Sequence, residues 1–322
     1  MTKLVRLSEI TGGAEAGGSD TLSRLQNGAI SIGNFDGVHK GHRELLGKVC
    51  DAAERVGGPA IAIVLDPHPA SVLRPHGAPP TLTTLPRRAE LMSSVGIDFL
   101  LVCESTREFL NQTADAFFSS LVVDSLQAKA VVEGPNFYFG RDRTGNVARL
   151  AELCSARNID FKVVEPSVRD ERMVSSSRVR EAIASGEITL ANEMLGSIYR
   201  IAGIVASGER RGRTLGFPTA NLDQVAEMLP GDGVFAGVAT TSDGARHAAA
   251  IHIGPNPTFD ETRKTKVEIH LLDYDGDLYG QSLMVELLGK VRGVQKFPDA
   301  AALVDQLHSD LQSVRAILPQ SF

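Results

Sequence analysis

The chain has 322 residues, and at about 150 residues per domain this length favours two domains. Hydrophobic residues make up 43% and charged residues 22%, and the formal net charge is -6. This balance is typical of a globular protein and disfavours a nucleic-acid partner. No apolar run reaches the roughly 18 residues that a membrane helix needs. Three widely spaced cysteines without a C-x-x-C pair argue against a disulfide framework or a zinc site, and fit a reducing cytoplasm.

The first half alternates short apolar runs with amphipathic segments. Residues 1–10 contain no signal-peptide run, and the Gly-rich residues 11–20 indicate a surface loop. We expect strands at residues 29–32, 60–65, 99–103, 130–132 and 161–164. Helices are expected after residue 42 and at residues 86–95, 114–121 and 147–157. Nearly continuous apolar strands separated by helices predict a Rossmann-like α/β domain with a parallel sheet covered on both faces. Such a sheet binds ligands at the carboxyl ends of its strands.

The pattern changes past about residue 186. A short helix at residues 188–195 is followed by strands at residues 201–206, 234–239, 248–253, 267–272 and 283–288. Turns rich in Gly, Pro and Asp separate these strands, which predicts a small antiparallel β-barrel. A final helix is expected to begin at Asp299 and to pack on the barrel through an apolar stripe from Leu303 to Leu318. The predicted domains are residues 1–187 and 198–322, joined by a linker helix at residues 188–197.

Residues 33–42 read Gly-Asn-Phe-Asp-Gly-Val-His-Lys-Gly-His and lie between the first predicted strand and helix. Gly33 and Gly37 allow a tight turn close to a ligand. The helix N-terminus offers unpaired N–H groups and a positive dipole end. His39 and His42 are three residues apart, so they share one side of the junction. They could hold ATP phosphates and stabilise the charge of departing pyrophosphate, or they could simply cap the helix.

This segment resembles the H-x-G-H nucleotidyltransferase superfamily. Residues 174–180, Val-Ser-Ser-Ser-Arg-Val-Arg, resemble its Ser-Ser-Ser/Thr-x-x-Arg signature. Taken alone, these serines are only a good helix cap. The resemblance implies that ATP is bound by Gly33, Asn34, Phe35, Asp36, Ser176, Ser177 and Arg180, with His39 and His42 as catalytic residues.

Two further turns bear on the substrate. Residues 66–69, Asp-Pro-His-Pro, and residues 134–140, Gly-Pro-Asn-Phe-Tyr-Phe-Gly, resemble flavin-site segments of the FMN-adenylylating members. The resemblance implies flavin contacts from Pro67, His68 and Asn136, although both turns could also be structural loops. Leu65 stands where many members have an aromatic residue, so the stacking partner of the flavin ring stays open.

Residues 208–222 contain the most specific motif in the chain. They resemble the Gly-rich loop and Pro-Thr-Ala-Asn signature of riboflavin kinases. Gly212 and Gly216 would let backbone donors wrap ATP phosphates. Thr219 and Asn221 would supply hard oxygen ligands for Mg²⁺. This loop also contains three basic residues, Arg210, Arg211 and Arg213. They either form a solvated basic face or help to attract ATP.

Residues 253–259 and 267–272 also match the riboflavin kinases. Glu268 aligns with the family's general base, and on a strand it shares a face with His270 while Val267, Ile269 and Leu271 point to the other face. His252 stands where Asn is common. Arg292 and Phe297 match the segment that folds over the flavin.

The order of these motifs is that of bifunctional riboflavin kinase/FMN adenylyltransferases. The resemblance implies ATP-dependent phosphorylation of riboflavin to FMN in the second half and adenylylation of FMN to FAD in the first, both with Mg²⁺. The implied partners are riboflavin, FMN, FAD and ATP, with neither nucleic acid nor membrane, and the oligomeric state is open. One alternative is a phosphopantetheine or nicotinamide mononucleotide acceptor for the first half, which the attached kinase disfavours. Another is that one half is a silent flavin or nucleotide sensor, which the complete set of site residues disfavours.

Overall fold

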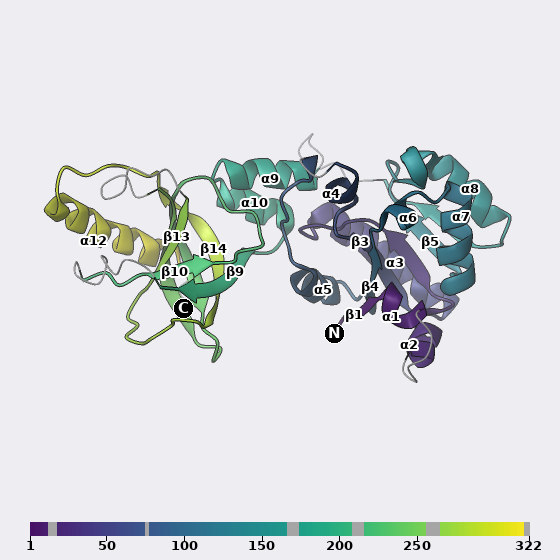
Figure 1. Cartoon of the computed structure of the whole chain (residues 1–322), viewed down its shortest axis with the longest axis horizontal. Coiled ribbons are helices and arrows are strands. Elements are labelled where there is room, and N and C mark those ends of the chain that lie inside the picture. Colours follow the sequence, from purple (N-terminus) through teal and green to yellow (C-terminus); the bar gives the residue numbers. More distant parts are fainter. Residues whose placement is uncertain (12–17, 75–76, 166–173, 208–215, 256–264, 319–322) are drawn as a thin grey trace. The chain divides into compact units, whose positions relative to one another are not determined.

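The computed structural model describes residues 1–11, 18–74, 77–165, 174–207, 216–255 and 265–318 (Figure 1). The chain forms two compact units. The first contains Met1–Pro79 and Thr84–Val174, and the second contains Pro80–Thr83 and Ser175–Phe322. The domain boundaries predicted from the sequence, at residues 187 and 198, stay a prediction. Among the helices that the structure describes, none combines the length and apolar character that crossing a bilayer demands.

The first unit is built on a six-stranded parallel sheet, as its apolar runs predict. Its order is β1-β4-β3-β2-β5-β8. The strands are β1 (Lys3–Arg6), β2 (Ala29–Ile32), β3 (Ala60–Asp66), β4 (Phe99–Glu104), β5 (Ala130–Glu133) and β8 (Asp160–Val163). The chain moves from β2 to β3 and β4 on one side, and β5 then pairs with the other side of β2. Ligands of such sheets bind at this reversal, outside the carboxyl ends of the strands.

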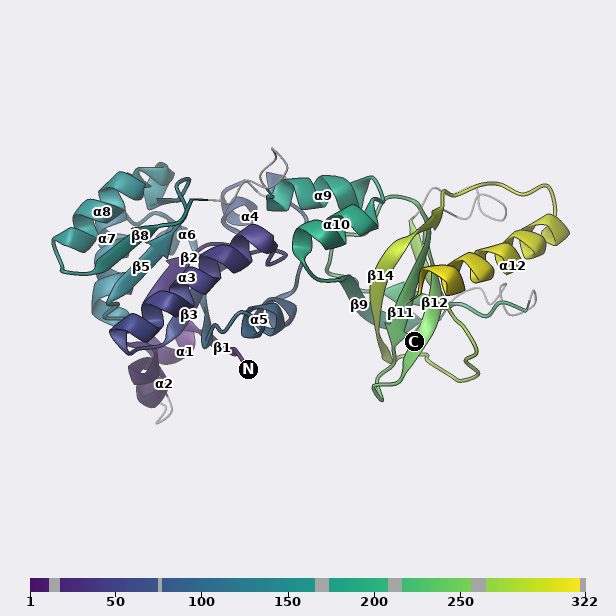
Figure 2. The same ribbon diagram turned by 180° about the vertical axis from the view of Figure 1, so that it is seen from behind.

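Successive strand residues point to opposite sides of this sheet, so each face carries apolar side chains. Helices cover both faces. Ile61 and Ile63 belong to one apolar core, whereas Ala62 and Val64 belong to the other. The second core includes residues of α3 (Lys40–Val56) and α5 (Leu85–Ser93), and Figure 2 shows α3 lying over the strands. The remaining elements are α1 (Leu7–Thr11), α2 (Gly18–Leu25), α4 (Pro69–Leu73), α6 (Arg107–Leu110), α7 (Ala114–Phe117), a π-helix (Phe118–Ser125), β6 (Tyr138–Phe139), a 3₁₀ turn (Arg141–Arg143), β7 (Gly145–Asn146) and α8 (Val147–Ser155).

Three local predictions in this unit need correction. The predicted surface loop at residues 11–20 is wrong at both ends, because α1 includes Thr11 and α2 begins at Gly18, while residues 12–17 lie outside the described residues. The helix predicted at residues 114–121 runs on as a π-helix to Ser125. The edge strand β1 is missing from the prediction, because its four residues begin and end with a charged side chain and give little apolar signal.

The second unit contains a closed antiparallel barrel, as predicted. Two helices precede it, α9 (Ser176–Ala184) and α10 (Ile188–Leu195). The barrel order is β10-β13-β12-β11-β14-β9. Closure leaves no open sheet edge, so every strand is paired on both sides. The strands are β9 (Tyr199–Ala206), β10 (Ala220–Asp223), β11 (Gly233–Thr240), β12 (Arg246–Gly254), β13 (Lys266–Leu271) and β14 (Ser282–Arg292). Sequence analysis missed β10, whose Ala-Asn-Leu-Asp sequence lacks β-branched residues.

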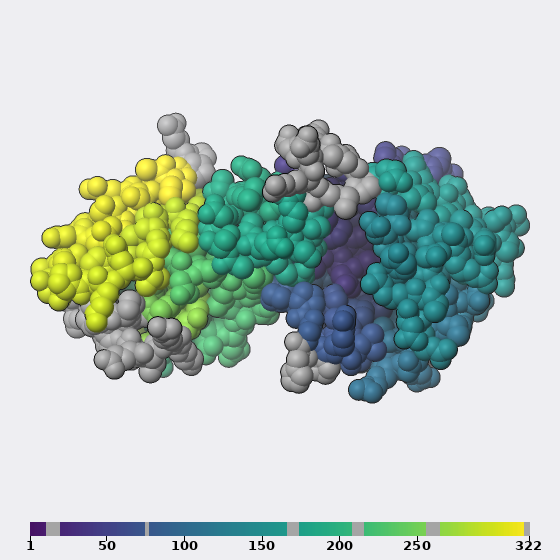
Figure 3. All heavy atoms as spheres, turned by 90° about the horizontal axis from the view of Figure 1, so that it is seen from above, coloured from purple at the N-terminus to yellow at the C-terminus, as the bar shows by residue number. Residues whose placement is uncertain are grey.

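The terminal helix α12 (Ala300–Ile317) packs on the barrel, as its apolar stripe predicts. The Asp299 side chain caps it by accepting a hydrogen bond from the Ala302 N–H at 2.9 Å. Val314 is fully buried in a small core with Ala236 of β11, and Leu311 packs against the same core. Figure 3 shows α12 as the yellow layer over the green strands.

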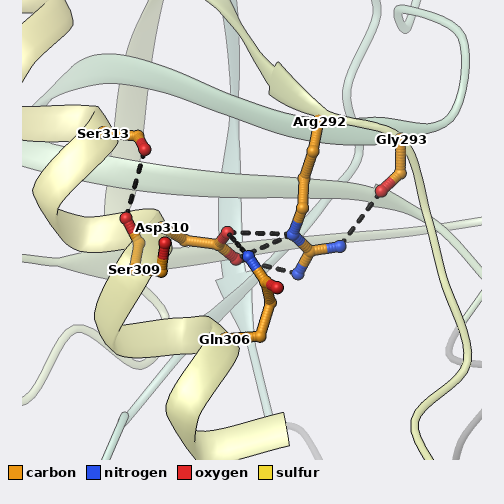
Figure 4. A network of polar contacts seen from close by, with 6 residues as sticks. All are labelled: Arg292, Gly293, Gln306, Ser309, Asp310 and Ser313. Atoms are coloured by element: carbon orange, nitrogen blue, oxygen red, sulfur yellow. Dashed lines mark hydrogen bonds and ion pairs between the residues drawn. The ribbon is translucent and has the colours of Figure 1, made fainter.

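A buried ion pair fastens α12 to the end of β14 (Figure 4). The Asp310 carboxylate, only 2% exposed, accepts hydrogen bonds from Arg292 Nε at 2.9 Å and Nη2 at 2.8 Å. The Gln306 side-chain amide donates to the same carboxylate at 2.9 Å. Arg292 Nη1 donates to the Gly293 carbonyl at 3.0 Å. Geometry of this bidentate kind fixes both side chains.

We expect Asp310→Ala to loosen α12 without disturbing the first unit. The substitution leaves the half-buried Arg292 guanidinium without its carboxylate, and breaking a buried pair costs about 3–5 kcal/mol. Hydrogen exchange should therefore speed up in Ala300–Ile317 and stay unchanged in α3. The matched control is Asp305→Ala at an exposed position of the same helix. Equal exchange in the two variants would show that the pair does not hold the helix.

Candidate active sites

The loop between β2 and α3 has an unusual backbone. Phe35 and Val38 have φ angles of 47° and 41°, and Gly37 has a φ of 84°. Left-handed geometry costs about 1–3 kcal/mol at a non-glycine residue, and Val38 is β-branched. The Phe35 and Val38 side chains are both buried in the core beneath the sheet's carboxyl edge. Burial of these side chains therefore offsets part of the backbone strain.

A buried arginine holds the same loop from the side. Arg88 of α5 donates from Nη2 to the Asp36 carboxylate at 3.0 Å and from Nη1 to the Asn34 carbonyl at 2.8 Å. Arg88 is 7% exposed and Asp36 is 6% exposed. Sequence analysis missed Arg88. The sequence feature that could have revealed Arg88 is its position on the buried face of α5, next to Ala89 and one turn before Leu91 and Met92.

His39 and His42 lie together directly after this loop. Their rings stack with centroids 3.6 Å apart, and Phe35 meets His42 edge-on at 5.3 Å. His39 is the N-cap of α3, and its Nδ1 accepts a hydrogen bond from the His42 N–H at 3.2 Å. The neutral His39 ring therefore carries its proton on Nε2.

Burial lowers the pKa of His42 well below its usual value, and the nearby His39 and Arg88 lower this pKa further. His42 is therefore neutral at neutral pH. Its Nδ1 is buried and has no hydrogen-bond partner in the part of the chain that the structure describes. The neutral imidazole of His42 can form hydrogen bonds with a ligand without first losing a proton.

The two predicted flavin turns reach the same edge of the sheet. Pro67 and His68 follow β3, and Asn136 follows β5, so both turns leave strands that pair with β2. His68 caps α4 by accepting a hydrogen bond from the Ala70 N–H at 3.1 Å. Asn136 is exposed, and the neighbouring Phe137 and Phe139 rings stack at 5.5 Å. The fold thus brings the Gly33–His42 segment and both turns together at one carboxyl edge.

Ser176, Ser177 and Arg180 lie in the first turns of α9, which the structure groups with the second unit. Ser175 is the N-cap of this helix. Arg180 Nε donates to the Pro80 carbonyl at 2.7 Å. The predicted contribution of Ser176, Ser177 and Arg180 to the same ATP site as His39 and His42 stays a prediction.

The barrel places three polar residues of the second site in one row. Asn221 of β10 lies directly opposite Glu268 of β13, which lies directly opposite His252 of β12. Directly opposed residues of an antiparallel pair share a face, with Cβ atoms about 4.5–5.5 Å apart. Val267, Ile269 and Leu271 are buried, whereas Glu268 and His270 are half-buried. The predicted alternation along this strand is therefore confirmed.

Thr219, directly before β10, lines a cavity of about 410 Å³. This volume lies within the usual range of small-molecule pockets. Its other walls are Val205, Pro218, Ala220, Ile269, Leu271 and the loop of residues 274–279. Gly216 has a φ of 85°, which favours glycine. Gly212, Arg210, Arg211 and Arg213 lie outside the described residues.

Imidazole rings that sequence analysis did not assign hold the segment before Thr219. His270 Nδ1 donates to the Pro218 carbonyl at 2.8 Å. The buried Phe217 ring meets the ring of His270 at 5.7 Å and that of His308, on α12, at 5.1 Å. The segment that carries Thr219 is thus fixed by both the barrel and α12.

Arg292 and Phe297 lie close together, with the Arg292 guanidinium carbon 5.6 Å from the centre of the Phe297 ring. The guanidinium already binds Asp310 and the Gly293 carbonyl. The predicted contact of Arg292 and Phe297 with a flavin stays a prediction.

Comparisons with known proteins match each half of the chain to a described family. A family model described as FAD synthetase matches residues 22–178, and one described as riboflavin kinase matches residues 195–318. A bifunctional riboflavin kinase/FMN adenylyltransferase of Pseudomonas fluorescens is 33% identical over 90% of this chain and 93% of its own length. The Escherichia coli (strain K12) protein of the same name is 33% identical, over 89% and 91% respectively.

A solved structure titled as a macrolide-efflux protein from Streptococcus pneumoniae is similar as well. It covers 97% of this chain and 98% of its own, with a TM-score of 0.82 and 26% identity. The two matched family models, their order along the chain and the curated relatives lead to one conclusion. The chain belongs to the family of bifunctional riboflavin kinase/FMN adenylyltransferases, with the FAD synthetase domain first and the riboflavin kinase domain second.

Proposed function

We propose that the barrel unit of this chain phosphorylates riboflavin with ATP to give FMN, and that the α/β unit adenylylates FMN to FAD with release of pyrophosphate. One observation carries the assignment: each unit brings a pair of motif residues together in its fold. His39 and His42 stack at the sheet's carboxyl edge, and Asn221 and Glu268 lie side by side on the barrel. The geometry of each pair comes from contacts within its own unit.

In the barrel site, Glu268 is the general base. Its carboxylate accepts the proton of the ribityl 5′-hydroxyl as that oxygen attacks the γ-phosphorus of ATP and ADP leaves. The Thr219 hydroxyl and the Asn221 amide oxygen hold the metal ion. Thr219 directly precedes β10 and Asn221 is its second residue, and their oxygens would suit a hard cation such as Mg²⁺. Mg²⁺, when bound, neutralises charge on the phosphates.

In the α/β site, His39 and His42 act on the phosphates of ATP. The FMN phosphate attacks the α-phosphorus and pyrophosphate departs. His39 Nε2–H donates a hydrogen bond to an oxygen whose negative charge grows in the transition state. His42 lies against the first ring and binds the phosphates as a neutral imidazole. The α3 N-terminus adds its backbone dipole. Pro67, His68 and Asn136 contact the flavin of FMN.

The proposal predicts that Glu268→Gln stops the first reaction and spares the second. Gln keeps the size and polarity of the side chain but cannot take a proton. The rate of riboflavin phosphorylation in single-turnover kinetics should fall by about 10²–10⁴, while FAD synthesis from supplied FMN continues. Glu193→Gln, at an exposed position on α10, is the control. A near-wild-type phosphorylation rate would remove Glu268 from the mechanism.

The complementary variant is His42→Ala. Loss of one transition-state donor typically lowers kcat by about 10²–10³. We therefore expect FMN to accumulate when the full-length variant is given riboflavin and Mg-ATP, with chromatography separating FMN from FAD. Undiminished FAD formation from FMN would refute the phosphate site at His39 and His42.

Arg88→Met tests how the loop is held. The change removes both hydrogen bonds to the loop and leaves the Asp36 carboxylate buried without this cation. We expect a loss of at least tenfold in FMN adenylylation and no change in riboflavin phosphorylation. Arg87→Met is the matched control, because Arg87 pairs with Glu90 on the same helix. Equal adenylylation rates in the two variants would contradict a role for Arg88 in the site.

A further inference from the structure

Glu133 is a buried carboxyl group that the proposed mechanism does not use. It is the last residue of β5 and is only 2% exposed. It lies at the reversal of strand order, where β5 pairs with β2. The strand predicted at residues 130–132 stops one residue before Glu133. A carboxyl group on a fully covered strand of a parallel sheet is unusual, because such strands consist almost entirely of apolar residues.

The Glu133 side chain replaces main-chain pairing at the end of β2. The register between β2 and β5 includes Ala29 with Ala130 and Ile30 with Val131. Beyond these pairs, the Ile32 N–H donates to Glu133 Oε1 at 2.6 Å, within the buried interior. Ile32 directly precedes Gly33, where the nucleotide loop begins. A side chain on β5 therefore sets the last backbone position before the loop.

Glu133 also lies in surroundings that oppose its ionisation. Burial raises its pKa well above the usual value, and the nearby Ile32 N–H and Ser31 side chain only partly oppose this effect. Among the described residues, no charged side chain contributes to the shift. In its neutral form the carbonyl oxygen of the carboxyl group accepts the Ile32 N–H.

We propose that Glu133 is a positioning residue for FMN adenylylation: through its contact with the Ile32 N–H it holds the end of β2 from which the His39–His42 loop departs, and its ionisation as pH rises releases that hold. The inference rests on the function proposed for the α/β unit. A carboxylate without a counter-charge does not stay buried, because water solvates it far better. Ionisation therefore pulls the side chain away from Ile32, and the loop loses its fixed starting point.

The test compares Glu133→Gln with Glu133→Val in the full-length protein. Gln keeps an acceptor oxygen and has no proton to lose, whereas Val removes the acceptor. FMN adenylylation and riboflavin phosphorylation are measured from pH 6 to 10, approximately. We expect Glu133→Gln to stay within about threefold of wild type at neutral pH and to lose the alkaline fall in adenylylation. Glu133→Val should adenylylate at least tenfold more slowly at every pH. Phosphorylation should match wild type in both variants.

The control is Glu104→Gln, at the exposed last residue of strand β4 in the same sheet, which should keep the wild-type profile. Thermal unfolding across the same pH range gives a readout that needs no activity. Because the folded-state pKa of Glu133 is raised, its contribution to stability is full at low pH and is lost as pH rises through that pKa. Glu133→Gln should remove this loss.

The inference is overturned if Glu133→Gln keeps the wild-type alkaline fall in adenylylation, or if folded Glu133→Val adenylylates FMN at the wild-type rate. Should Glu133→Val fail to fold, the pH profile of Glu133→Gln decides. A wild-type chain that makes no FAD from FMN would instead defeat the proposed function itself. In that case the unfolding profiles still decide whether Glu133 is a neutral acid in the folded protein.

Discussion

The buried contact between Arg88 and the loop that starts at Gly33 is the constraint on which the first site depends. The loop must bring His39 to the start of α3 through two non-glycine residues with positive φ, and such a backbone persists only when its surroundings determine it. Arg88 binds Asn34 and Asp36, on the two sides of Phe35. The stacked imidazoles follow within a few residues, so their place is set before any nucleotide arrives. Preorganisation of this kind lowers the cost of reaching the transition state.

The barrel site follows the same principle with different groups. Thr219 lies on a short segment, and the contacts that fix it come from His270 on β13 and His308 on α12. The helix in turn is fastened through Asp310 to the end of β14. Asn221 and Glu268 need no such support, because the register of a closed barrel already places them opposite each other. The terminal helix is therefore part of the kinase site's framework as well as a cover for the barrel.

Much of the fold could be predicted because its elements carry strong local patterns. The apolar run of β3 predicts a buried parallel strand, and the Asp299 cap correctly marks the start of α12. The short strands β1 and β10 could not be found in this way, since neither has enough apolar residues to give a period. Motifs named the candidate residues of both sites, but Arg88 and Glu133 belong to no motif, and the match at residues 267–272 gave His270 no role. These three residues make contacts with segments 52 or more positions away, which a local pattern cannot reveal.

A double-mutant cycle between Arg88 and Asp36 tests the central constraint most directly. FMN adenylylation is measured for wild type, Arg88→Met, Asp36→Asn and the double variant, with riboflavin phosphorylation as the internal control. If the pair acts as one unit, the double variant should be little slower than either single variant, with a coupling energy of about 1–3 kcal/mol. Additive effects, within about 0.5 kcal/mol, would show that the two residues act independently and that the loop is held in some other way.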